Sequence, residues 1–185
     1  MAAVVVTERE KMLRGELYDA TDAELTQLRR SARRLWQQFN REPRGELLAE
    51  LLGTLGEGST IEAPFHCDYG VHIHLEAGVF VNFNCVFLDP APIHIGAQTM
   101  LGPSVQLYTA SHPLEAKTRV AGPELAFPIR IGTRVWIGGG TIVLPGVTIG
   151  DDTTIGAGSV VTRSIPVGVL AAGNPCRVIR ELATS

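Results

Sequence analysis

The sequence predicts a mainly β protein: a parallel β-helix of six-residue repeats, preceded by an α-helical segment and interrupted by one long loop. Three observations predict this fold. Residues 7–53 have a helical period, the following residues have a period of six, and that period is absent between Leu107 and Ile131. We therefore expect a helical segment at 1–53 and a β-helix at 54–185 that contains a loop at 108–130.

The helical segment is predicted from its helix starts and from one apolar stripe. Thr7 with Glu10, and Thr21 with Glu24, each fit a capping box, in which a hydroxyl and a carboxylate satisfy free backbone N–H groups. Behind the second box, apolar side chains recur every three or four positions and so share one helix face. They are Leu25, Leu28, Ala32, Leu35, Trp36 and Phe39. The helical pattern breaks at 43–45.

The six-residue period is seen when the chain is aligned on itself. One column contains Ile131, Ile137, Val143, Ile149, Ile155 and Val161, and glycine directly follows four of them. The frame also passes through Ile95, Leu101 and Leu107, and a weaker one ends at Phe87 before a two-residue slip. Each hexad fits a short strand and a tight corner, so three hexads close one triangular coil around the aliphatic column. Successive coils then stack as parallel strands.

Composition and charge exclude several classes of function. A formal net charge of -3 gives no electrostatic case for binding nucleic acid. No stretch approaches the roughly 18 apolar residues of a membrane span, and Met1–Val6 lacks the basic start of a signal peptide. The three cysteines have neither an even count nor a C-x-x-C spacing, which argues against a disulfide framework and a zinc ribbon. We expect a soluble cytoplasmic protein without a nucleic-acid or membrane partner.

The long loop is the strongest candidate for a functional segment, because an excursion from a regular solenoid is usually functional or disordered. His112 lies near its root, followed by Pro113. A neutral imidazole titrates near working pH and can take a proton from a hydroxyl group. On the residues alone, a general base and a loop histidine fixed by proline are equally good interpretations.

Several segments together resemble the hexapeptide-repeat acyltransferases, and among them the maltose and galactoside O-acetyltransferases. The matching segments are KMLRGELY at 11–18, DYG at 68–70, NFN at 82–84, TASHP at 109–113, VWIG at 135–138 and AGNPCRVIR at 172–180. The resemblance implies a left-handed β-helix, contrary to the usual right-handed crossover. It also implies transfer of an acetyl group from acetyl-CoA to a sugar hydroxyl, with no metal.

The same resemblance implies roles for individual residues. His112 is the general base, and Asp68 and Asn82 face the acceptor sugar, although Asn82 also fits a corner asparagine. An acidic residue of the helical segment contacts the acceptor too. Asp19 and Asp22 compete for this position, and Asp22 also fits a helix start.

Three further positions bear on the acceptor. Trp136 lines the groove in the family, but it also fits an outward aromatic packed on a neighbouring chain. Pro90 follows Asp89 where galactoside-type relatives have a second acidic residue, which weakens the case for a galactoside. Glu124 fits a group that orients His112, a role that a backbone carbonyl could equally fill, and it also fits a solvated loop carboxylate.

Acetyl-CoA needs a groove for its pantetheine arm and cations for its phosphates. The resemblance places Gly139 and Ala157 along the pantetheine arm through their backbones. It places a larger set at the nucleotide end: Thr162, Arg163, Arg177 and Arg180. The arginines would form a local basic patch in an acidic chain, although ordinary surface cations fit the same pattern.

The family packs three β-helices around a three-fold axis with each site between two subunits, so we expect a homotrimer.

One alternative function is a metal enzyme like the γ-carbonic anhydrases. Lys117, however, stands where a further metal ligand would be sought, and His72 and His74 fit outward strand positions on one face. A metal assay on the purified protein separates the metal enzyme from the acetyltransferase. A second alternative is a non-catalytic scaffold, which acetyl-CoA binding would exclude. Glucose or maltose, a galactoside, a lipo-oligosaccharide or a non-sugar alcohol all remain possible acceptors.

Overall fold

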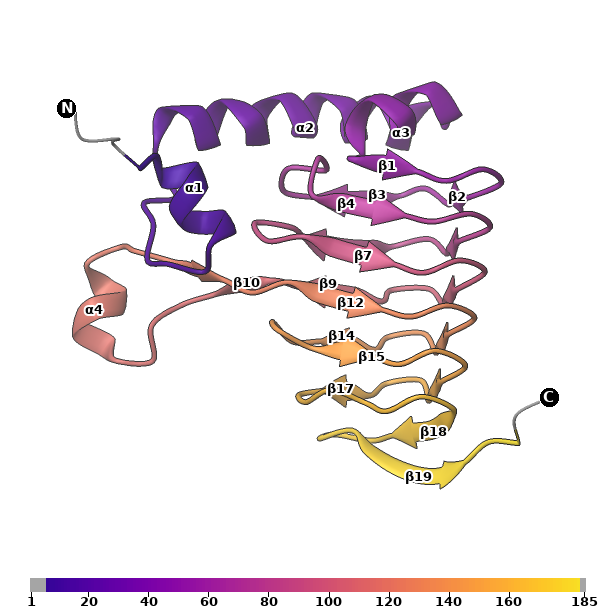
Figure 1. The fold of residues 1–185 in the computed structure, drawn as a ribbon. Helices are drawn as coiled ribbons and strands as arrows, with labels where there is room; N and C mark the ends of the chain where they lie inside the picture. Colours follow the sequence, from indigo (N-terminus) through magenta and orange to yellow (C-terminus); the bar gives the residue numbers. More distant parts are fainter. Residues whose placement is uncertain (1–5, 184–185) are drawn as a thin grey trace.

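The computed structural model describes residues 6–183; the apolar start at 1–5 and the last two residues of the expected β-helix region lie outside them. Three helices come first: α1 (Glu8–Leu13), α2 (Ala23–Arg41) and α3 (Gly45–Leu51). The chain then winds into a parallel β-solenoid of about six turns. In Figure 1, α2 and α3 lie across the first coil and close that end of the solenoid.

The solenoid has three sheets, one on each side. The first sheet contains β1 (Thr54–Leu55), β4 (Ile73–Leu75), β7 (Ile93–Ile95), β12 (Ile129–Ile131) and β15 (Thr148–Ile149). The second contains β2 (Thr60–Ile61), β5 (Phe80–Val81), β8 (Met100–Leu101), β13 (Trp136–Ile137), β16 (Thr154–Ile155), β18 (Val169–Ala172) and an antiparallel β19 (Arg177–Glu181). The third contains β3 (Phe65–Cys67), β6 (Cys85–Leu88), β9 (Gln106–Tyr108), β14 (Ile142–Val143) and β17 (Val160–Val161).

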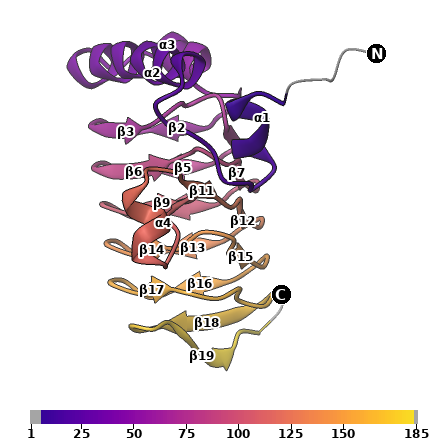
Figure 2. The same cartoon turned by 90° about the vertical axis from the view of Figure 1, so that its left-hand side faces the viewer.

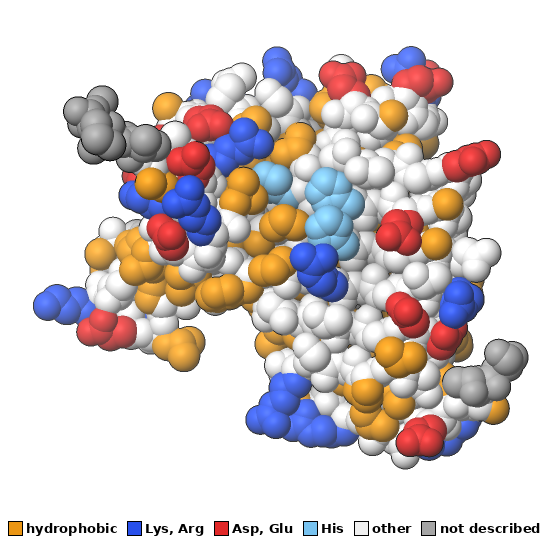
Figure 3. Space-filling model, viewed as in Figure 1, with side chains coloured by type: hydrophobic (Ala, Val, Ile, Leu, Met, Phe, Trp, Pro, Cys, Tyr) orange, Lys and Arg blue, Asp and Glu red, His pale blue; other side chains and the backbone are white. Residues whose placement is uncertain are grey.

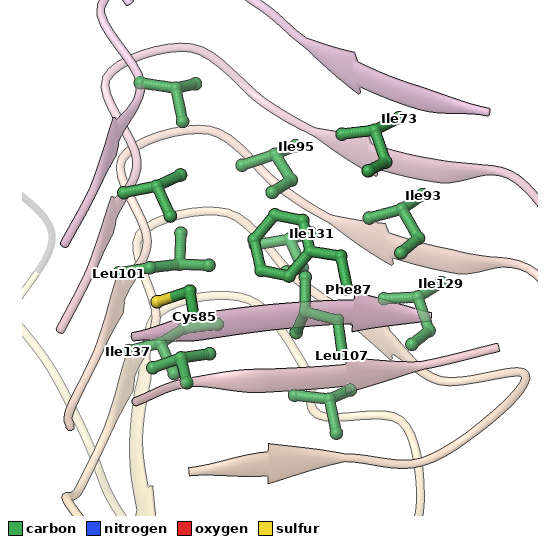
Figure 4. Packing of buried hydrophobic residues seen from close by; sticks show 14 of the residues in the cluster. Ile73, Cys85, Phe87, Ile93, Ile95, Leu101, Leu107, Ile129, Ile131 and Ile137 are labelled. Carbon is green, nitrogen blue, oxygen red and sulfur yellow. The ribbon is translucent and has the colours of Figure 1, made fainter. Parts of the chain in front are cut away.

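The aliphatic column of the sequence is confirmed as the core. Because each hexad is one side of a coil, consecutive members of the column enter the interior from different sheets. In the first sheet, for example, Leu75, Ile95 and Ile131 are in register in successive coils, and all are buried. Figure 4 shows Ile95 and Ile131 beside Phe87 in the interior. The six-residue period therefore reports one side of the triangle, and three such periods make one coil.

The helix starts are predicted correctly in one case and wrongly in the other. Thr7 and Glu10 form the expected capping box, with bonds of 3.1 and 2.9 Å. The second box is not formed, because the N-cap of α2 is Asp22, not Thr21. The Asp22 carboxylate accepts from the backbone N–H groups of Glu24 and Leu25, at 2.9 and 3.3 Å. An aspartate at this position fills the cap by itself.

The apolar stripe of α2 packs as expected. Leu25, Ala32 and Phe39 are buried, and Leu35 and Trp36 pack partly buried against the core of the solenoid. Since α2 and α3 share this core, the helical segment shields apolar side chains that the first coil would otherwise expose. No helix among residues 6–183 is long and apolar enough to cross a membrane.

The long loop contains secondary structure of its own. It forms an antiparallel pair, β10 (Ala110–Ser111) with β11 (Leu125–Ala126), and α4 (Ala116–Val120) lies between them. It leaves the solenoid at the corner where the third sheet passes to the first, and Figure 1 shows it projecting away from the coils; in Figure 2, which faces that side, α4 lies in front of them. The two-residue slip after Phe87 falls at this same corner, called here the third-to-first corner. The irregular parts of the repeat are thus gathered at one edge.

Candidate active site

A pocket of about 340 Å³ lies at the third-to-first corner, called here the corner pocket. Three parts of the chain form its wall: the helical segment, the corner of the first two coils, and the long loop. Its lining residues are Tyr18, Ala20, Thr21, Arg29, Asp68, Tyr69, Pro90, Ala110 and Glu124. The pocket mixes carboxylates, a guanidinium, hydroxyls and small apolar groups, which suits a polyhydroxylated molecule.

Asp68 is the predicted acceptor residue that lines the corner pocket. It is half-buried, and burial raises the pKa of its carboxyl group, while the positive charges of Arg29 and Arg33 lower it. Arg29 also fixes the pocket wall, since its guanidinium donates to the Tyr69 hydroxyl and to the Ala20 carbonyl, both at 2.5 Å. The bond to Tyr69 is charge-assisted and joins α2 to the corner of the coils.

Tyr18 and Glu124 join the helical segment to the long loop. Their backbones exchange N–H···O bonds of 3.1 and 3.0 Å, and the buried Tyr18 hydroxyl donates to the Glu124 carboxylate at 2.9 Å. The Glu124 carboxylate therefore binds Tyr18 and not His112, the partner considered from the sequence. Within residues 6–183 no hydrogen bond joins Glu124 to His112. The β10–β11 register, however, pairs Ser111 with Leu125, so His112 follows at the position opposite Glu124.

His112 directly follows β10 and is exposed. Ala110, two residues earlier, lines the corner pocket, and residues two apart in an extended chain face the same side. By this alternation the His112 side chain is expected on the side of the loop that faces the pocket, although His112 is not one of the pocket's lining residues.

The other acceptor candidates lie elsewhere in the chain. The Asp19 carboxylate accepts from the backbone and the hydroxyl of Thr21 at 2.8 and 2.7 Å, and Asp22 caps α2. Asn82 follows β5 at the corner where the second sheet passes to the third, and its Oδ1 accepts from the Phe83 N–H at 2.8 Å. Trp136, in β13, points outward from the second sheet with 54% of its surface exposed. None of the four lines the corner pocket.

The predicted coenzyme residues divide between two regions. Gly139 and Ala157 lie in consecutive coils at the corner where the second sheet passes to the third, called here the second-to-third corner. The chain is rich in glycine at this corner, so few side chains cover its backbone. A Cβ on Gly138 would lie 2.5 Å from the Ala157 nitrogen, so close stacking of the coils requires glycine there. Thr162 and Arg163 follow β17, whereas β19 carries Arg177 and Arg180. All four are exposed, and within residues 6–183 none of the three arginines forms an ion pair.

Three histidines near the first sheet occupy two different environments. His74 and His94 point outward from the first sheet and stack with ring centroids 4.6 Å apart, and Figure 3 shows histidines gathered on that face. The expectation that His72 also points outward is wrong. It is 6% exposed, and its Nδ1 lies 2.7 Å from the Asp89 carbonyl oxygen, because the lengthened corner turns it inward. Among the described residues, no three His, Cys, Asp or Glu side chains are grouped so that they could hold a metal ion.

Asp89 is a buried residue of this region to which the sequence pattern assigned no role. Its side chain is fully buried, and its Oδ1 accepts from the backbone N–H groups of Asp68 and Tyr69 at 3.0 and 2.9 Å. Burial raises the pKa of Asp89 to about 7, and the nearby Asp68 charge adds to this effect. The available signal was its place at the slip in the hexad frame, where a polar residue directly follows a buried strand.

Asp89 gives a testable dependence of stability on pH. Its folded pKa of about 7 exceeds the ordinary value of 3.8, so between these values the folded chain binds a proton that the unfolded chain does not. Its contribution to stability therefore falls as pH rises from about 4 to about 7. Asn cannot ionise, so we expect the free energy of unfolding of Asp89→Asn to rise by about 1–3 kcal/mol relative to the unsubstituted protein as pH increases across this range. Above pH 7 the difference should stay constant. Urea unfolding at pH 5, 6, 7 and 8 measures the difference; a constant difference would contradict this account.

Comparisons with known proteins identify the family. Residues 11–56 match the model of the maltose acetyltransferase hexapeptide capping motif, and residues 128–163 match that of the bacterial transferase hexapeptide, six repeats. The chain is 39% identical to the galactoside O-acetyltransferase of Escherichia coli, with 94% of this chain and 88% of that protein covered.

Two solved structures are also similar. The crystal structure of a maltose O-acetyltransferase from Clostridium difficile 630 superposes with a TM-score of 0.95 at 46% identity, over 96% of this chain and 98% of that one. A hexapeptide-repeat-containing acetyltransferase from Vibrio cholerae, complexed with acetyl coenzyme A, gives a TM-score of 0.90 at 42% identity, over 96% and 100% of the two chains. These matches confirm the left-handed β-helix. The chain belongs to the hexapeptide-repeat acetyltransferases, in the maltose and galactoside O-acetyltransferase family.

Proposed function

We propose that this protein transfers an acetyl group from acetyl-CoA to a hydroxyl group of a sugar, with His112 as the general base. The observation that carries the proposal is the corner pocket: Asp68 and Glu124 line it, and so does Ala110, two residues before His112. Such a pocket offers several hydrogen-bonding groups to a polyol next to a base. The family relationship to a maltose and a galactoside O-acetyltransferase supports a sugar acceptor.

The chemistry requires one proton to be moved. His112 takes the proton from the acceptor hydroxyl as its oxygen forms a bond to the acetyl carbonyl carbon. Backbone N–H groups stabilise the negative charge on the carbonyl oxygen. The carbon–sulfur bond then breaks, and the imidazolium of His112 returns its proton to the departing sulfur. Asp68 and Asn82 hold the sugar so that one hydroxyl faces His112, with Asp19 or Asp22 as a further contact and Trp136 along the groove.

A screen of acceptors tests this proposal most directly. Purified protein is supplied with acetyl-CoA and glucose, maltose, a galactoside or a simple alcohol, and release of the coenzyme thiol is followed. We expect release to depend on a sugar. Release with a simple alcohol but with no sugar would contradict the sugar part of the proposal and leave acetyl transfer in place.

The residues of the last coils fit acetyl-CoA, which would supply the activated acetyl group. The bare backbone at Gly139 and Ala157 suits the two amides of the pantetheine arm, and exposed cations suit its phosphates. We propose that Thr162, Arg163, Arg177 and Arg180 bind the nucleotide end, although the arginines lie on different elements of one chain.

Arg180 provides the test of the coenzyme site. We expect Arg180→Ala to raise the KM for acetyl-CoA about ten-fold, as loss of one charge-assisted bond would, and to leave the KM for the sugar within about two-fold. Initial rates with each substrate varied in turn measure both constants. Arg134→Ala is the matched control, because this exposed arginine pairs with Asp152 at 2.7 Å on another part of the surface. Equal increases in both KM values would contradict the assignment of Arg180 to the coenzyme site.

We also propose a homotrimer with its sites between subunits. The proposed residues lie at two different corners of a single chain: His112 and Asp68 at the third-to-first corner, and Asn82 and Gly139 at the second-to-third corner. If they act together, the second group must come from another copy. Cyclic symmetry then makes all three sites equivalent. The exposed side chains of Phe83, Met100 and Trp136, 47–54% accessible, offer an apolar surface for that contact.

A further inference from the structure

The corner pocket depends on a group that does not line it. Asp68 and Tyr69, which both line the pocket, belong to the turn that leaves β3. This turn ends at Gly70, whose φ of +73° is a conformation that other residues adopt only with strain. A Cβ on Gly70 would also lie 2.5 Å from the Leu51 carbonyl oxygen. Steric contacts thus restrict the conformation of the turn at Gly70, and the hydrogen bonds of its backbone N–H groups hold it in position.

Its backbone binds one side chain from the next coil. The Asp89 Oδ1 accepts from both the Asp68 and the Tyr69 N–H groups, and the main-chain oxygen of Asp89 lies 2.7 Å from His72 Nδ1. His72 in turn packs against Tyr69, with ring centroids 5.4 Å apart. Asp89 therefore contacts the turn directly through its side chain, and its backbone contacts His72, which packs on Tyr69 of the turn. Two hydrogen bonds to a buried carboxyl group are among the stronger polar contacts in proteins.

The cost of burying Asp89 indicates that its role is specific. Its other oxygen, Oδ2, is buried without a hydrogen-bond partner in the part of the chain described. Apart from His72, the other buried polar side chains among residues 6–183 are five hydroxyls, and each of them hydrogen-bonds to the backbone. Thr99, for example, donates to the Gly132 carbonyl at 2.7 Å and accepts from the Val135 N–H at 3.0 Å. An aspartate at the pocket corner reaches two successive N–H groups with one oxygen, at the expense of an unsatisfied atom.

We propose that Asp89 is a positioning residue for the acceptor: it fixes the turn at 68–70 and thereby holds the Asp68 carboxylate at the edge of the corner pocket. The inference rests on the proposed function, because it assumes that Asp68 binds the acceptor. Asp89 itself does not touch the pocket and acts through the turn.

Two substitutions separate this role from a structural one. Asp89→Asn keeps an oxygen that can accept both N–H groups, whereas Asp89→Ala removes it. We expect Asp89→Ala to raise the KM for the acceptor about ten-fold or more and to leave the KM for acetyl-CoA within about two-fold. Asp89→Asn should stay within about three-fold of the unsubstituted protein for both. Thr99→Val is the matched control, since it removes a similar buried bond at another corner and should leave both KM values unchanged.

The dependence on Asp68 is tested by combining substitutions. If Asp89 acts through Asp68, Asp89→Ala should have little further effect on the acceptor KM in a chain that already carries Asp68→Ala. Additive effects of the two substitutions would overturn the proposal. So would an Asp89→Ala protein with an unchanged acceptor KM, or one whose loss of activity follows its loss of thermal stability alone.

The outcome is also distinguishable from a failure of the proposed function. Crystal structures of Asp89→Ala and Asp89→Asn show directly whether the turn moves, whatever the acceptor. A displaced turn in the alanine variant, with the turn in place in the asparagine variant, supports the positioning role even if no sugar is acetylated. An undisplaced turn in Asp89→Ala overturns it even if the protein acetylates sugars.

Discussion

Replacing His112 with alanine is expected to lower kcat for acetyl transfer by about 10²–10⁴-fold, the usual contribution of a positioned general base. The hydroxyl group of a sugar is a poor nucleophile until its proton is removed, and His112 is the only exposed histidine among residues 6–183. Because His112 is exposed and lies after β10, its removal should not disturb the core. The dissociation constant for acetyl-CoA should therefore change little.

Steady-state kinetics with a sugar acceptor, together with calorimetric titration of acetyl-CoA, measures the two quantities. Leu114→Ala is the control: Leu114 is 96% exposed on the same loop and should tolerate the change. Added imidazole should restore part of the activity of the His112→Ala protein by replacing the missing base. If that protein keeps most of its kcat, His112 is not the base; if it loses acetyl-CoA binding as well, His112 belongs to the coenzyme site.

Mixed trimers are expected to recover activity that neither parent has. His112 and Asn82 lie at different corners of one chain, so in the proposed trimer each site takes one of them from each neighbour. In random assemblies of His112→Ala and Asn82→Ala chains, about a quarter of the sites would contain both native residues, by the symmetry of the ring. The mixture should then reach roughly a quarter of the activity of the unsubstituted protein.

The experiment uses chains that are co-expressed or refolded together, and light scattering confirms their assembly. A mixture of His112→Ala chains with chains that carry both substitutions is the control, because it contains no complete site. If the activity of the mixture does not exceed the summed activities of the two parent proteins, either both residues act within one chain or Asn82 is only a corner residue of the coil. A monomer in solution would exclude the trimer itself.

The sequence by itself determined the solenoid and its interior. The six-residue period is a local property, because every coil repeats the same strand and corner, and the apolar position of each hexad can only face inward. The apolar stripe of α2 was predictable for the same reason, since periods of 3.6 and 6 residues are both encoded within a few turns of chain, but its place across the end of the solenoid was not. The position of His112 in the one long interruption was also evident from the repeat.

Only the tertiary structure decided how the irregular parts meet. Three hexads separate the slip after Phe87 from the long loop, so the repeat itself places both at one corner, but it does not reveal which segments of the helical region meet them there. The bond from Tyr18 to Glu124 joins residues far apart in the chain, and Asp22 took the cap assigned to Thr21 because a competing side chain reached the same N–H groups. His72 turned inward and Asp89 was buried for a related reason. Their environments are set by the neighbouring coil, whose contacts depend on how the coils stack and not on the residues beside them in the sequence.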